Sequence, residues 1–172
     1  MSDWGHLARR FFGSLRPGGP AARDVVWVDG VLTDAELALW QRMYGPDRRH
    51  SVQVARDVER VLGADATRPV LAAALLHDVG KIDTHLRTYG RVVATITVKL
   101  VGRDDVVAWR RSRGLHRRLA LYAMHPQLGG DLLQLAGSDA LTVAWAREHH
   151  SPTAAWTLPR SIADVLDACD ND

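Results

Sequence analysis

Apolar side chains recur at helical spacing near the start of the 172-residue chain. This amphipathic pattern predicts a short helix over residues 3–15. We expect the helix to dock on its own domain, although a helix lying on a membrane surface would show the same pattern. Residues 17–20 have the sequence Pro-Gly-Gly-Pro, which breaks regular structure and predicts a hinge. The apolar positions of the helix are Trp4, Leu7, Phe11, Phe12 and Leu15.

Local start signals predict helices further along the chain. Thr33 followed by Glu36 forms a capping-box pattern, and it opens a helix that runs to about Tyr44. Thr67 with Pro69 opens another, because proline in the first turn removes an N–H group that has no partner there. We expect further helices over residues 47–62, 70–79, 104–111, 115–124, 126–136, 139–149 and 160–170.

Two segments fit more than one secondary structure. Residues 25–31 are rich in β-branched side chains and predict a short strand or an extended entry segment. Residues 88–101 contain a β-branched run at 92–98, which fits a helix or a strand. We favour a buried helix there, because the neighbouring segments are helical.

The whole pattern predicts an all-α, multi-helix bundle, with at most a short extended segment near the N-terminus. The predicted helix at 70–79 is almost wholly apolar, which is typical of the centre of a bundle. Hydrophobic residues make up 47% of the chain, enough for one sizeable core. We therefore expect an N-terminal helix and hinge at residues 1–20 and a single helical domain at residues 21–172.

Composition narrows the classes of function. The net charge of +2 reflects a slight excess of arginine and gives no strong signal for nucleic-acid binding. Cys169 is the only cysteine, which excludes an intrachain disulfide and a cysteine-rich zinc site. The sequence has neither an apolar run long enough to span a membrane nor the apolar core of a signal peptide. We expect a cytoplasmic protein.

Histidine and aspartate occupy positions that are typical of metal ligands. His77 and Asp78 stand together at the end of the apolar helix 70–79. A carboxylate buried there needs an ionic partner or a metal, because an isolated buried charge costs several kcal/mol. The other candidates are His50, His125 before Pro126, the pair His149 and His150, and Asp164 and Asp167 on the last predicted helix.

In this order the residues resemble the HD-domain superfamily of metal-dependent phosphohydrolases, whose pattern is H…HD…D. The resemblance is strongest to the subgroup with additional histidines, which includes the HD-GYP proteins. The subgroup's HDxGK run corresponds to residues 77–81, and its His-Pro with a downstream glycine corresponds to residues 125–129. Its paired histidines correspond to residues 149–150, and its terminal AD…DA pattern to residues 163–168. The match spans residues 48–169.

The resemblance implies an HD-domain bundle with one or two divalent transition metals, for which Fe, Mn, Ni, Co or Zn suit imidazole and carboxylate ligands. In such a site Asp78 bridges two metals, and the implied ligands are His50, His77, Asp78, Asp164, His125, His149 and His150. His149 is preferred to His150 as the ligand of the pair, so that His150 is left to contact substrate. Asp164 is preferred to Asp167 on the family pattern alone.

The implied activity is hydrolysis of a phosphomonoester or phosphodiester by a metal-activated hydroxide. Asp78 would orient this nucleophile, and Lys81, one of only two lysines, would contact the phosphate. The partner would be a small phosphorylated substrate, with a nucleotide favoured. The chain lacks the GYP signature after His150, so hydrolysis of cyclic di-GMP is not expected. Pro46 stands where some relatives carry an additional glutamate ligand, so a third metal is not expected.

Two other functions remain open from the sequence. One is a di-iron oxygenase of the HD fold, and the other is a non-catalytic HD signalling or binding module.

The arginine cluster at residues 110–118 fits a nucleotide phosphate, an acidic partner or a solvated face. A homodimer also remains open, with the segment before Pro17 as a packing element.

Overall fold

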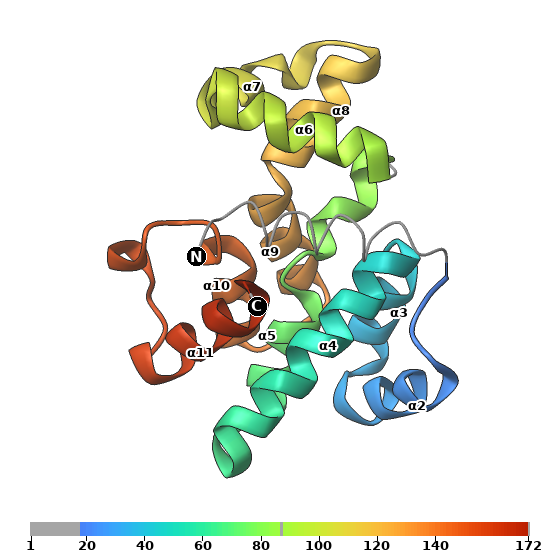
Figure 1. Ribbon diagram of the computed structural model, residues 1–172, viewed down its shortest axis with the longest axis vertical. Coiled ribbons are helices and arrows are strands. Elements are labelled where there is room, and N and C mark those ends of the chain that lie inside the picture. The colour runs from blue at the N-terminus through green and yellow to red at the C-terminus, as the bar shows by residue number, and fades with distance from the viewer. Residues whose placement is uncertain (1–17, 87, 172) are drawn as a thin grey trace.

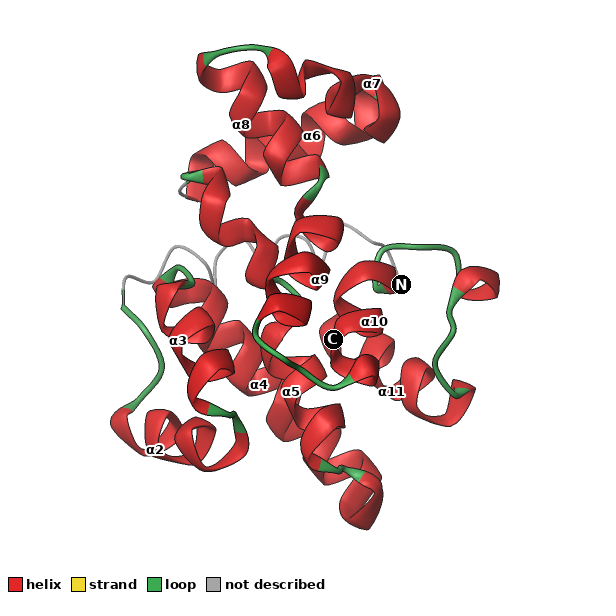
Figure 2. Ribbon diagram, turned by 180° about the vertical axis from the view of Figure 1, so that it is seen from behind, coloured by secondary structure: helices red, strands yellow, loops and turns green. Residues whose placement is uncertain are grey.

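The computed structural model describes residues 18–86 and 88–171. These residues form α-helices, short 3-10 helices and loops, and none of them lies in a strand (Figure 2). The predicted all-α, multi-helix bundle is therefore confirmed. No helix among the described residues combines the length and the apolar character that crossing a lipid bilayer requires.

The helices follow one another closely. The predicted helix over residues 3–15 lies outside the described residues, as does Pro17 of the predicted hinge. The α-helices are α2 (Ala22–Val31), α3 (Asp34–Arg42), α4 (Gly45–Leu62), α5 (Arg68–Leu76), α6 (Thr88–Val101), α7 (Arg103–Ala108), α8 (Gly114–Ala123), α9 (His125–Leu135), α10 (Ala140–Glu148) and α11 (Arg160–Asn171). The 3-10 helices are η1 (Gly63–Asp65), η2 (Val79–Thr84), η3 (Trp109–Arg111) and η4 (Thr153–Ala155).

Local signals placed most helix starts correctly. The capping box opens α3: the backbone N–H of Thr33 donates to Glu36 Oε2 at 2.9 Å, and the N–H of Glu36 donates to Thr33 Oγ1 at 3.3 Å. Residues 88–101 form α6, so the preference for a helix over a strand is confirmed there. The expected burial is wrong, because Val93, Ile96 and Leu100 are exposed and Ala94 alone among the described side chains of α6 is buried.

Two predictions were wrong, one about the secondary structure of a segment and one about the end of a helix. Residues 25–31 form neither a strand nor an extended segment, because they belong to α2. β-branched residues lower helix propensity only slightly, and tertiary packing of Val28 into the core outweighs this preference. Helix α5 ends at Leu76 rather than at residue 79, and the chain then turns through Asp78 into η2.

The main core surrounds α5. Every residue from Val70 to Leu76 is buried, which confirms that this apolar helix lies at the centre of the bundle. Helices α4, α10 and α11 pack around it (Figure 1). The buried side chains of Trp40 and Trp145 belong to the same core. We call this part of the molecule the body.

Helices α6, α7 and α8 form a lobe that extends from the body, at the top of Figure 1. A small apolar cluster holds the lobe together: Leu86, Ala94, Val106, Leu119 and Ala123. The five arginines at residues 110–118 are all exposed on this lobe. Helix α8 packs on η2 and runs directly into α9, so the lobe joins the body beside the turn that follows α5.

Candidate metal centre

The end of α5 sets two adjacent side chains in the interior. His77 is the C-cap residue, and its Nδ1 donates a hydrogen bond to the carbonyl of Ala74 at 2.9 Å. Asp78 leaves the helix with φ −98° and ψ 8°, which turns its side chain toward the same region. His77 is 1% exposed and Asp78 is 6% exposed. The early end of α5 is thus what brings both side chains to one site.

A close approach of two backbones positions His125, the next candidate ligand. A Cβ atom on Gly80 would overlap the carbonyl oxygen of His125 and would lie 2.6 Å from the amide nitrogen of Gly129. Both positions are far inside van der Waals contact, so only glycine fits this point of η2. The approach carries the first turn of α9, and with it His125, to the side of Asp78. The two glycine-containing motifs of the sequence are therefore one packing unit.

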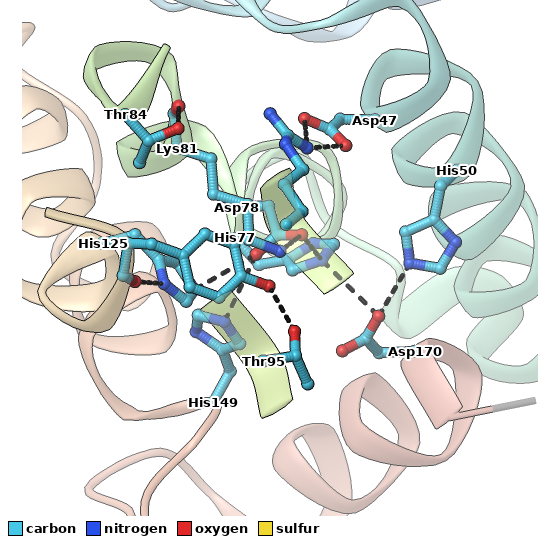
Figure 3. Close-up of polar contacts among 12 residues, drawn as sticks. Asp47, His50, His77, Asp78, Lys81, Thr84, Thr95, His125, His149 and Asp170 are labelled. Atoms are coloured by element: carbon cyan, nitrogen blue, oxygen red, sulfur yellow. Dashed lines mark hydrogen bonds and ion pairs between the residues drawn. The ribbon is translucent and has the colours of Figure 1, made fainter. Parts of the chain in front are cut away.

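One group of candidate ligands lies around one oxygen of Asp78. His125 Nε2 is 3.3 Å and His149 Nε2 is 3.7 Å from Asp78 Oδ1 (Figure 3). His150 completes the group, and each of the four residues offers a ligand atom within 4.8 Å of the others. We call these residues, Asp78, His125, His149 and His150, the first group.

A second group forms on the other side of Asp78. It contains His50, His77 and Asp170, again with ligand atoms within 4.8 Å of one another. Asp170 Oδ1 is 2.8 Å from His50 Nε2 and 3.5 Å from His77 Nε2. Asp78 Oδ2 lies 3.5 Å from His77 Nε2, so the two oxygens of Asp78 face the two groups. A carboxylate in this position can offer one oxygen atom to each group.

The donor atoms fit a metal. Four polar atoms are buried and have no hydrogen-bond partner among the described residues: Nε2 of His77, His125 and His149, and Oδ1 of Asp78. Each buried unpaired polar atom costs about 1–3 kcal/mol, so four that converge on one region need a compensating ligand. The Nδ1 atom of each of these histidines donates to a backbone carbonyl, of Ala74, Tyr122 and Ala146 respectively. In the neutral ring each Nε2 therefore presents its lone pair inward, the usual arrangement of a metal-binding histidine.

Burial and charge set the protonation of the site. Burial lowers the pKa of His77, but the negative charges of Asp170 and Asp78 outweigh this and raise it to about 9. Burial raises the pKa of Asp78, but the charges of Lys81 and His77 hold it well below its usual value. Burial lowers the pKa of His125 to about 4. Asp78 is thus ionised and His125 neutral at neutral pH, the forms that bind a metal, whereas His77 has to lose its proton when a metal binds.

Lys81 and His150, the residues expected to contact substrate, lie at the edge of the site. Lys81 Nζ donates to Asp78 Oδ2 at 2.5 Å, on the side of η2 that faces Tyr122. His150 is exposed, with its ring centre 4.1 Å from that of His149 and 5.1 Å from that of His125. Although the residue as a whole is exposed, its ring is desolvated beside His149 and His125, and this desolvation together with their charges lowers the pKa of His150 to about 2. Its ring is therefore neutral. Lys81 and His150 therefore offer a cation and a neutral imidazole at the edge of the site.

The structure brings six of the seven predicted ligands into the two groups, and Asp164 is the exception. Asp164 is half-exposed and forms an ion pair with Arg160, one turn earlier on α11, at 2.6 Å. Asp170 has to replace it in the candidate ligand set. A signal for Asp170 was present: with Ala163 and Leu166 it forms an i, i+3, i+7 stripe on the buried face of α11. A carboxylate within an apolar stripe needs a buried partner.

No protein-family model, curated protein or solved structure matches the chain. The resemblance to HD-domain proteins therefore rests on the residues and their arrangement alone.

Proposed function

We propose that this protein is a metal-dependent phosphohydrolase of the HD-domain superfamily, acting on a phosphomonoester or phosphodiester, with a nucleotide as the favoured substrate. The observation that carries the proposal is the position of Asp78 between two groups of buried histidines whose Nε2 atoms converge. The order of these residues along the chain, H…HD…HP…HH…D, supports it when Asp170 takes the last place.

Each group would hold one metal ion. His50, His77 and Asp170 would bind one, His125 and His149 with His150 would bind the other, and Asp78 would serve both. Imidazole and carboxylate ligands without thiolate suit Fe, Mn, Ni, Co or Zn. Metals in such a pair lower the pKa of a water molecule and polarise a phosphate oxygen.

The side chains around the metals have separate tasks. Lys81 can make three hydrogen bonds and uses one with Asp78, which leaves donors for a phosphate oxygen. Asp78 is ionised and accepts hydrogen bonds, so it can orient a water molecule for attack on phosphorus. His150 is neutral and exposed, which suits a hydrogen bond to the substrate rather than an ion pair.

The proposal is tested by metal content and by hydrolysis. Mass spectrometry of protein purified without chelator or affinity nickel should find about two transition metals per chain. His77→Ala and Asp78→Ala should lose them, whereas His116→Ala, an exposed histidine of α8, should keep them. Wild-type protein should hydrolyse p-nitrophenyl phosphate or bis(p-nitrophenyl) phosphate, and both metal-site variants should not. A wild-type chain that takes up no metal would contradict the proposal.

Two outcomes would favour the other functions that the sequence leaves open. Iron as the bound metal, together with oxygen consumption, would favour a di-iron oxygenase. Full metal occupancy without turnover of either ester would favour a signalling or binding module.

A further inference from the structure

Helix α6 brings two polar side chains of the lobe to the metal centre. Arg91 and Thr95 are four residues apart and therefore lie on one face of α6. Arg91 Nη1 donates to both carboxylate oxygens of Asp47 on α4 (Figure 3). Thr95 Oγ1 lies 3.1 Å from the hydroxyl oxygen of Tyr122 on α8. Tyr122 in turn packs against His125, with ring centres 5.5 Å apart.

Arg91 is held in place but retains donors. Its side chain is 14% exposed, its Nε donates to the carbonyl of Leu86, and its guanidinium lies 5.3 Å from the ring centre of Tyr44. The Nη2 group donates to no described residue. A guanidinium has five N–H donors in a planar fork, so the Nη2 pair is available to an oxyanion.

A second cation lies within electrostatic reach of Arg91. Lys81 is 13% exposed, donates to Asp78, and has its Nζ 5.6 Å from the ring centre of Tyr122. Burial lowers the pKa of Lys81, but the negative charge of Asp78 outweighs burial and raises it. The charge of Asp47 also raises this pKa, whereas the positive charge of Arg91 lowers it. Lys81, Arg91 and Tyr122 thus surround one region that adjoins Asp78 and His125.

The charge of the lobe favours anions in this region. Residues 88–118 contain eight basic and two acidic residues, a net charge of +6. The whole chain has +2, so the remaining residues sum to −4. A positive lobe beside a buried site raises the local concentration of an anionic substrate.

We propose that Arg91 and Lys81 together bind the terminal phosphate of a phosphomonoester, with the Tyr122 and Thr95 hydroxyls as additional hydrogen-bonding groups. This inference rests on the proposed function and narrows its substrate class. A phosphomonoester carries a doubly charged phosphate with three terminal oxygens, which suits two cations besides the metals. A diester carries one charge and has a substituent on both sides. The ligand atoms are buried, so a phosphate at the end of a molecule reaches them more readily than one within it.

The alternative role for Arg91 is structural: its ion pair with Asp47 would hold α6 against α4. Two variants separate these roles, because each removes the ion pair and only one removes the guanidinium. Asp47→Asn keeps Arg91, so its affinity for phosphate should equal or exceed that of the wild type. Arg91→Gln should weaken phosphate binding about ten- to hundredfold, the usual effect of losing a charge-assisted hydrogen bond.

The experiment is calorimetric titration of inorganic phosphate into the full chain, both loaded with Mn²⁺ and metal-free. Metal content, measured in parallel, should be equal in the wild type and both variants. Equal weakening by Asp47→Asn and Arg91→Gln, or no phosphate binding by the wild type, would overturn the inference. If Arg91→Gln does not fold, Arg91→Lys makes the same comparison, because lysine lacks the fork and should weaken binding while Asp47→Asn does not.

Kinetics test the substrate class separately. The wild type should turn over p-nitrophenyl phosphate better than the bis-ester, and Arg91→Gln should lower kcat/KM more for the monoester. A preference for the diester would overturn the inference but leave the proposed function intact. Arg91-dependent phosphate binding without turnover of either ester would support the anion site and contradict the proposed hydrolysis.

Discussion

Asp78 shows how a single residue organises the site. Its two oxygens face different groups of histidines, and one of them also accepts a hydrogen bond from Lys81. A buried carboxylate is stable only when it is paired, and here Lys81 and the protonated form of His77 supply positive charge. Removal of the Asp78 carboxylate would therefore disturb both groups at once.

The first prediction concerns the aspartates of α11. Asp170→Asn should reduce bound metal from about two ions per chain to about one, because it removes the carboxylate of the second group. Asp164→Asn should leave metal content unchanged, since Asp164 lies in neither group and pairs with Arg160 on the surface of α11. Loss of this exposed ion pair should lower the stability of the fold by about 1 kcal/mol or less. Metal analysis of both variants checks the pair. Loss of metal in Asp164→Asn but not in Asp170→Asn would restore the ligand expected from the family pattern.

The second prediction concerns the backbone contact between η2 and α9. Gly80→Ala should destabilise the fold by at least about 2 kcal/mol, because the new methyl group overlaps the backbone of His125 and Gly129. Gly30→Ala in α2 is the control, since a Cβ there meets nothing within 4 Å. It should stabilise by about 0.5–1 kcal/mol through helix propensity. Urea denaturation measures both, and an unchanged midpoint for Gly80→Ala would contradict the close contact.

At the scale of elements, one side chain joins two helices. Glu36 is fully buried in the first turn of α3, where it completes the capping box with Thr33. Its Oε2 also accepts a hydrogen bond from Arg68 Nη1, at the start of α5, at 2.9 Å. The start of α3 is thereby fixed to the start of the central helix.

The third prediction follows from the pKa of Glu36. Burial raises this pKa, but hydrogen bonds from Thr33 and Arg68 outweigh burial and lower it below 4.5. The ionised carboxylate therefore stabilises the fold above pH 4.5, and this contribution is lost as the pH falls further. Glu36→Gln should cost about 2 kcal/mol at pH 7 and progressively less below pH 4.5.

Denaturation of both proteins between pH 7 and pH 3 checks this dependence. Glu59→Gln is the matched control, because Glu59 pairs with Arg56 on the exposed surface of α4 and should cost less than about 1 kcal/mol. A difference between wild type and Glu36→Gln that stays constant across this range would show that the charge of Glu36 does not matter.

At the scale of the whole molecule, the candidate metal centre lies where the lobe meets the body. The body supplies the candidate ligands, whereas α6 and α8 supply Arg91, Thr95 and Tyr122. The two parts differ in their cores. The cluster of the lobe has five buried apolar residues, and that of the body has twenty-five.

The fourth prediction concerns this difference. Amide protons of α6–α8 should exchange through openings of lower free energy than those of α5 and α10, because fewer buried contacts oppose the opening of the lobe. Hydrogen-exchange mass spectrometry of the full chain measures both regions in one sample. Equal protection of α6 and α5 would mean that lobe and body open together.

The helical class, most helix positions and six of the candidate ligands could be predicted from the sequence. These depend on short-range physics: a helix is set by periodicity and caps within a few residues, as at Thr33 and Glu36. The cost of burying adjacent His and Asp residues beside an apolar helix indicated His77 and Asp78. The later histidines were expected from the resemblance to the HD-domain pattern.

The remaining features depend on the packing of the helices against one another. Asp170 rather than Asp164 faces the site because α11 rests on α4 and α5 with its Ala163 and Leu166 side inward. Residues 25–31 are helical because Val28 packs into the core, which outweighs a weak local preference. Arg91 reaches Asp47 across 44 residues of sequence. Such contacts depend on how helices distant in the chain pack together, and neither periodicity nor motif spacing contains that information.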